Sequence, residues 1–156
     1  MSGERLPSPE EIATQIQIIR DQIAELQGLA AQIESRLRSV QAAKDTIEAL
    51  EKEGGGETLF PADPDLNVLV RAKPVETGKA IVLLGLNIYA TLDKAKAVEV
   101  LSKKEAALKK SLESIKAEIE KLAKMHDQQL QLLQMISLQQ SQARGQQGGG
   151  SGKPAG

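Results

Sequence analysis

The chain has 156 residues, and its 20 Lys and Arg against 21 Asp and Glu leave a net charge of −1. This balance argues against a nucleic-acid binder and against a polybasic membrane module, because both carry a basic surplus. The absence of cysteine excludes disulfides and thiolate metal sites, and a single histidine, His126, excludes a cluster of several histidines around a metal within one chain. Aromatic residues make up only 1% of a chain that is 40% apolar, which favours an elongated, aliphatic helical seam.

A first long helix is predicted over residues 8–53, after an N-terminal extension over residues 1–7. Ser8 and Glu11 have the spacing of a capping box, and Pro9 stands at the first helical position. Apolar residues then recur at alternating steps of four and three, which is the heptad seam of a coiled coil. Lys44 is the one charged position in this seam, which comprises Ile12, Ile16, Ile19, Ile23, Leu26, Ala30, Ile33, Leu37, Val40, Lys44 and Ile47.

The middle segment, residues 54–92, opens with three glycines that are expected to end the first helix. Apolar residues then alternate with polar ones, which indicates two β-hairpins with strands near residues 57–60, 66–73, 80–84 and 86–92. Two hairpins alone leave open strand edges, so we expect them to pair with other subunits. The longest apolar run, Ala80–Leu86, is too short to span a membrane, and we therefore expect a cytoplasmic protein.

A second long helix is predicted over residues 93–141, with Thr91 or Asp93 as its cap, and residues 142–156 are predicted to be a disordered, glycine-rich tail. His126 and Gln129 either occupy seam positions, where polar residues specify register, or the seam moves by one residue onto Met125 and Leu130. We favour the second interpretation. The predicted seam comprises Val98, Leu101, Glu105, Leu108, Leu112, Ile115, Ile119, Leu122, His126, Gln129, Leu133 and Ile136.

Neither helix can bury its apolar stripe alone, so the simplest arrangement folds the two helices back on each other. The predicted fold is therefore α+β and mainly α: a long antiparallel two-helix coiled coil with two β-hairpins inserted between the helices. This order of elements closely resembles the α-class subunit of archaeal prefoldin over residues 8 to about 140. The resemblance is carried by the segments GGGETL (54–59), VLVRAK (68–73), KAIVLLG (79–85) and YATLDKA (89–95).

The resemblance implies a chaperone subunit that needs no ATP or cofactor and has no enzymatic activity. It implies a hexamer of two α-class and four β-class subunits, in which the hairpins build a β-barrel platform. The coiled-coil tips would hold unfolded polypeptides and deliver them to a group II chaperonin. The residues expected to bind clients are Leu6, Ile12, Ile16, Ile18, Ile19, Leu130, Leu132, Leu133, Met135, Ile136 and Leu138. Those expected to join subunits are Leu59, Leu66, Val68, Val70, Ile81, Leu83, Leu86 and Ile88.

A second hypothesis is a coiled-coil scaffold or tether that joins a complex without binding unfolded chains. Apolar residues outside the seam near both helix ends, such as Ile18 and Leu138, favour the chaperone, because a tether is expected to end in polar tips. We expect no nucleic-acid or membrane partner in either case.

Overall fold

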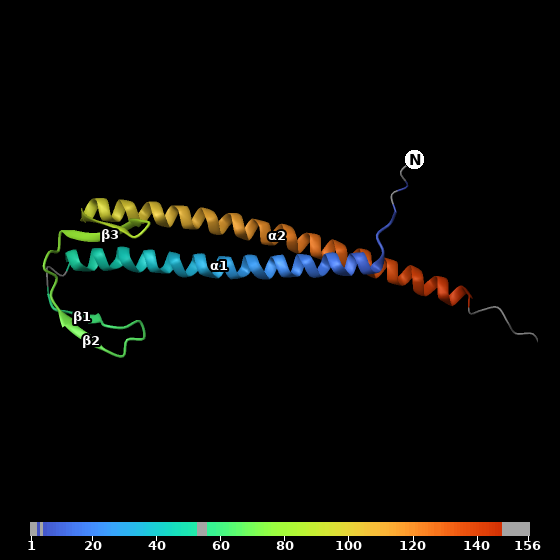
Figure 1. Ribbon diagram of the computed structural model, residues 1–156, viewed down its shortest axis with the longest axis horizontal. Coiled ribbons are helices and arrows are strands. Elements are labelled where there is room, and N and C mark those ends of the chain that lie inside the picture. Colours follow the sequence, from blue (N-terminus) through green and yellow to red (C-terminus); the bar gives the residue numbers. More distant parts are fainter. Residues whose placement is uncertain (1–2, 4, 53–55, 148–156) are drawn as a thin grey trace, which may run out of the picture. The chain divides into compact units, whose positions relative to one another are not determined.

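The computed structural model describes residue 3 and residues 5–52 and 56–147. Two long helices enclose two β-hairpins in the sequence, which confirms the predicted fold (Figure 1). The elements in chain order are α1 (Pro9–Lys52), β1 (Thr58–Pro61), β2 (Leu69–Ala72), β3 (Lys79–Gly85), β4 (Ile88–Asp93) and α2 (Lys94–Gln147).

The chain divides into two compact units, and each contains a segment of both helices. Unit 1 consists of residues 1–31 and 113–156, and unit 2 consists of residues 32–112 with all four strands. In unit 2 the helices run antiparallel, because Glu51 on α1 pairs with Lys94 at the start of α2 while the earlier Lys44 pairs with the later Glu105.

Both helices begin at side-chain caps. The Ser8 amide donates to the Glu11 carboxylate at 2.8 Å and the Glu11 amide donates to the Ser8 hydroxyl at 3.2 Å, which confirms the capping box. Of the two candidates for the second cap, Asp93 acts, since its carboxylate accepts from the Lys96 amide at 2.8 Å. The glycines expected to end α1 include residues 54 and 55, which lie outside the described residues, and α1 ends at Lys52.

The end of α2 differs from the prediction. The sequence analysis places the helix end at residue 141 and a disordered tail from residue 142, whereas α2 continues to Gln147. The helix can continue past its last seam residue without burying further side chains, because this stretch contains the good helix formers Gln142, Ala143 and Arg144. Residues 148–156 lie outside the described part of the chain.

The seam forms where the heptad pattern predicts it. Every predicted seam position of both helices is buried or half-buried, including Ile23, Leu26, Ile33, Leu37, Val40, Leu108, Leu112, Ile115, Ile119 and Leu122. Among the described residues no polar side chain is fully buried, so the core is aliphatic, as the composition indicates. The fully buried apolar residues are Ile12, Ile16, Ile19 and Ile33 on α1, Val82 on β3, and Ala97, Leu101 and Leu122 on α2.

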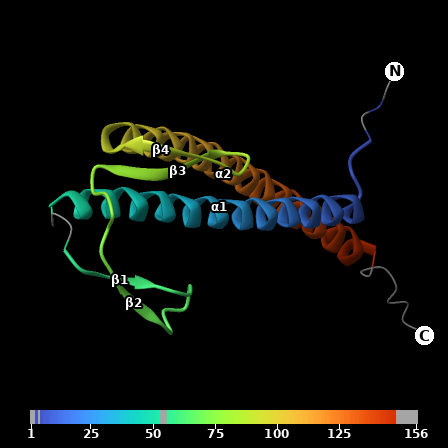
Figure 2. The ribbon, with the colours of Figure 1, turned by 60° about the vertical axis from the view of Figure 1, so that its left-hand side comes forward.

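The β3–β4 hairpin has one inner and one outer face. Cross-strand partners point to the same side of an antiparallel pair. The partners Val82 and Ala90 are buried and half-buried, whereas the partners Leu83 and Tyr89 on the other face are exposed. Figures 1 and 2 show this hairpin beside the first turns of α2, and the Lys104 ammonium donates to the Leu83 carbonyl there. The inner face therefore packs on the helices and leaves the outer face open.

The β1–β2 hairpin stands apart from the helices in both views and is exposed on both faces (Figure 2). Phe60 pairs with Val70 on one face and Leu59 with Arg71 on the other. Apolar side chains that are exposed on both faces of one hairpin require partners outside this chain if they are to be buried.

Strand β2 begins later than the alternation predicts. Leu66 and Val68 lie in the connection before it, because the Asp63 carboxylate takes the amides of Asp65, Asn67 and Val68 out of the strand ladder. Leu66 adopts a φ of 62°, which this tight connection imposes. Leu86 likewise lies in the β3–β4 turn, after Gly85, whose φ of 142° suits glycine.

Candidate functional site

The exposed apolar residues of unit 1 are fewer than the sequence predicts. Three members of the predicted client site are buried in the core and are not part of the exposed surface, namely Ile12, Ile16 and Ile19. Leu130, Leu132, Leu133 and Ile136 are half-buried. The members of the predicted client site that are openly exposed, called here the tip residues, are Leu6, Ile18, Met135 and Leu138.

One cross-helix contact explains why the end of α2 is exposed. Arg20 on α1 donates from Nε to Nε2 of His126 on α2 at 3.1 Å, so these residues face each other. For an antiparallel pair, moving back from Arg20 to Pro9 brings the chain opposite Ser137. The α2 residues from Leu138 onward therefore have no α1 residue beside them, and residues 137–146 are all exposed. This overhang follows from the register, which the sequence pattern did not reveal.

The polar residues His126 and Gln129 lie in the seam. The His126 side chain is 17% exposed, whereas Met125 is 41% exposed, so the seam does not move onto Met125. Leu130, the other residue of that interpretation, is half-buried beside Gln129. The hydrogen bond from Arg20 explains the difference between His126 and Met125, because it satisfies a ring nitrogen that a coiled-coil interior otherwise leaves unpaired. On the outer side, His126 Nδ1 lies 3.6 Å from the Asp127 carboxylate.

The hairpins carry the second group of exposed apolar side chains, in unit 2. Each of the eight residues predicted to join subunits is exposed within this chain. Sequence reasoning missed Tyr89, although its place opposite Leu83 follows from the alternation of β4. It also missed four further exposed apolar residues of the same region, namely Phe60, Leu69, Val75 and Leu84.

The Asp63 carboxylate organises the connection between β1 and β2. It accepts the Val68 amide at 3.0 Å and the Asn67 side-chain amide at 2.9 Å, besides the Asp65 amide at 3.1 Å. The bond from Val68 is the main reason that the pKa of Asp63 is lowered, and the Asn67 side chain adds to it. The carboxylate therefore acts as a structural acceptor.

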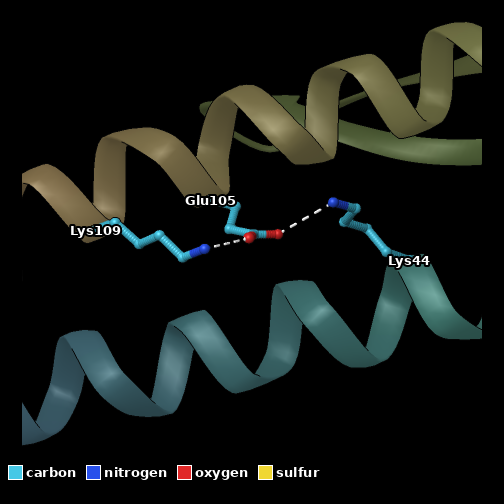
Figure 3. A network of polar contacts seen from close by, with 3 residues as sticks. All are labelled: Lys44, Glu105 and Lys109. Atoms are coloured by element: carbon cyan, nitrogen blue, oxygen red, sulfur yellow. Dashed lines mark hydrogen bonds and ion pairs between the residues drawn. The ribbon is translucent and has the colours of Figure 1, made fainter.

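A charged network joins the helices in unit 2 (Figure 3). Glu105 Oε2 accepts from the Lys44 ammonium of α1 at 3.2 Å, and Oε1 accepts from the Lys109 ammonium one turn along α2 at 2.7 Å. The hydrogen bonds from Lys109 and then from Lys44 lower the pKa of Glu105. Glu105 is thus held as a carboxylate between two ammonium groups.

Neither a metal site nor a membrane span appears in the described part of the chain. Across residues 5–52 and 56–147, no three His, Asp or Glu side chains are grouped as metal ligands would be. The described helices also lack any segment that is both long and apolar enough to cross a bilayer.

The chain is similar to known archaeal proteins along most of its length. Residues 19–139 match the family described as Prefoldin subunit. Prefoldin subunit alpha of Aeropyrum pernix is 61% identical over 146 residues, which cover 93% of this chain and 96% of the relative. Prefoldin subunit alpha of Hyperthermus butylicus is 32% identical and covers 75% of each chain. That of Metallosphaera sedula is 30% identical over 86% of this chain and 93% of the relative.

A solved structure shows the same fold. A filamentous prefoldin (PFD) from Methanocaldococcus jannaschii, determined by cryo-EM, aligns with a TM-score of 0.63 at 22% identity, over 73% of this chain and 94% of that chain. The relatives and the family match together support a chaperone-type subunit that works in an oligomeric prefoldin assembly. With the helix–hairpin–hairpin–helix order and these matches in agreement, the chain belongs to the prefoldin family.

Proposed function

We propose that this chain is the α-class subunit of an ATP-independent, cytoplasmic chaperone that holds unfolded polypeptides and delivers them to a group II chaperonin. The observation that carries the proposal is the exposure of the tip residues: Leu6 just before α1, Ile18 in α1, and Met135 and Leu138 in α2. Exposed apolar residues near the ends of the helices favour a protein partner. The proposed protein has no catalytic role and no cofactor.

The chemistry of the tip residues suits clients of many sequences. They are unbranched or aliphatic side chains, and Met135 in particular can repack around an irregular apolar segment. One such surface is small, so a single contact with an extended chain is weak. Several subunits on one platform raise the effective concentration for later contacts, and avidity can exceed single-site affinity by about 10²–10⁴. Release then needs no nucleotide, because losing a few contacts lowers avidity steeply.

The hairpins supply the proposed assembly surface. The outer face of β3–β4 and both faces of β1–β2 expose apolar side chains that no described part of this chain covers. Strand pairing with β-class subunits would cover the open edges, and packing against those subunits would cover the three exposed faces. The proposed assembly contains two α-class and four β-class subunits.

The client proposal is tested by changing all four tip residues to serine in a hexamer whose β-class tips are truncated. We expect weaker suppression of aggregation when a denatured protein is diluted into the assembly without nucleotide. The matched control is Leu29→Ser, which changes a leucine of α1 that is about as exposed as Ile18 but lies away from the helix ends. Full activity of the four-serine hexamer would place the client site elsewhere. An unaltered hexamer that forms but holds no client would favour the tether.

The assembly proposal has a separate test. Changing Ile81 and Leu83, on the outer face of β3, to glutamate should prevent the hexamer from forming with the β-class partner, as measured by size-exclusion chromatography. Val75→Glu is the control, because Val75 is fully exposed but lies between the hairpins. An intact hexamer with glutamate at both β3 positions would show that this face is not an interface.

A further inference from the structure

Two charged residues interrupt an otherwise aliphatic seam and face each other in unit 2. Lys44 is the one charged position of the α1 seam, and Glu105 is the one acidic position of the α2 seam. Their side chains are 25% and 16% exposed, and their charged atoms lie 3.2 Å apart. Partly shielded charges of this kind cost desolvation energy, so an aliphatic pair would serve the packing at least as well.

The aliphatic seam by itself specifies the alignment of the helices poorly. A heptad repeat presents the same pattern of Ile, Leu and Val after a shift of seven residues, so a shifted pairing keeps most of the apolar contacts. The shift moves one helix along the other by about 10 Å. Something other than the repeat must therefore distinguish the native alignment from the shifted ones.

The charged pair makes that distinction in both directions. In one shifted pairing Lys44 faces Val98 and Glu105 faces Leu37, so Lys44 loses its partner and Glu105 keeps only Lys109 of its own helix. In the opposite shift Lys44 faces Leu112 and Glu105 faces Glu51, a residue of like charge. Each outcome is unfavourable, because a shielded charge without a partner costs far more than a paired one.

Lys109 makes Glu105 a better defined partner. Its ammonium occupies Oε1 of Glu105, which leaves Oε2 for Lys44, so the carboxylate is oriented from within its own helix (Figure 3). The next residue before Glu105, Lys104, donates to the Leu83 carbonyl of β3. The alignment of the helices therefore also determines where the β3–β4 hairpin lies along α1.

We propose that Lys44 and Glu105, with Lys109 as the positioning residue, select the register of the helix pair and thereby the placement of the β3–β4 hairpin. The pair contributes specificity of alignment and little net stability. This role goes beyond the proposed chaperone function and does not depend on it, since it requires neither a client nor a partner subunit.

The test measures register directly. Because the chain lacks cysteine, Ser39→Cys and Glu99→Cys, at exposed positions of α1 and α2, accept two spin labels and no other site reacts. Electron–electron resonance then gives the distance between the labels in the full chain, diluted with unlabelled chain. The unaltered seam should give one narrow distance, and a shift of one heptad should give a second one, because it displaces the labels by about 10 Å along the helices.

The decisive variant replaces both charges, as Lys44→Leu with Glu105→Leu. We expect a melting temperature that is unchanged or higher, together with a second label distance. Glu105→Lys should also add a second distance, and the exchange of all three charges, Lys44→Glu with Glu105→Lys and Lys109→Glu, should restore the single one. Glu120→Lys, at an exposed ion pair outside the seam, should change nothing. A single native distance in the double-leucine variant would overturn the proposal, as would failure of the charge exchange to restore it.

Discussion

Two neighbouring isoleucines of α1 allow the same substitution to be compared at a seam position and at a surface position. Ile19 is 4% exposed and Ile18 is 45% exposed, so Ile→Ala removes the same three carbon atoms from a buried site and from an open one. At about 0.8 kcal/mol per buried CH₂, Ile19→Ala loses about 2.4 kcal/mol of transfer free energy before any cavity term. In a pair of helices the neighbouring side chains can relax into the cavity. We therefore expect a total loss of about 2–3 kcal/mol in the free energy of unfolding, the low end of the usual range.

Ile18→Ala is expected to cost much less. About half of the transfer term applies at a half-open site, and the better helix propensity of alanine returns about 0.4 kcal/mol, which leaves about 0.8 kcal/mol. At about 2–4 °C per kcal/mol for a chain of this size, Ile19→Ala should lower the melting temperature by about 5–10 °C and Ile18→Ala by at most 2–3 °C. Far-UV circular dichroism during heating measures both values. Equal shifts, or a larger shift for Ile18→Ala, would refute the assignment of the two residues to seam and surface.

Three further predictions concern polar contacts. Ser8→Ala removes the capping box of α1 and should lower the free energy of unfolding by about 0.5–2 kcal/mol in urea titrations, whereas Ser8→Asp should retain most of it. Asp63→Ala should speed amide exchange at Val68, as measured by NMR. Because the pKa of Asp63 is lowered, its carboxylate contributes fully to the stability of the fold above a pH of about 4, and this contribution is lost as the pH falls through the lowered value. The pKa of Glu105 is also lowered, so its contribution to stability is likewise lost in acid. Acid should therefore destabilise the helix pair less in Glu105→Gln than in the unaltered chain, and an identical acid response would contradict the ion pairing.

The local features of this protein are set by its sequence. The capping box, the choice of a seam residue every three or four positions and the two hairpin pairs all depend on residues that are close together along the chain. Ile33 occupies a seam position of the heptad, so it is buried whichever helix lies opposite. For the same reason the sequence alone predicts the α+β class and the order of elements.

Tertiary structure decided which apolar residues are available to a partner. The predicted client site includes both Ile16, a seam position, and Ile18, which lies outside the seam, but packing buries the first and exposes the second. Periodicity also leaves two placements of His126 open, and the hydrogen bond from Arg20, over a hundred residues away in the chain, accounts for its place in the seam. The meeting of Lys44 with Glu105 has the same origin. Register is a property of two helices together, so a repeating pattern read along one helix cannot determine it.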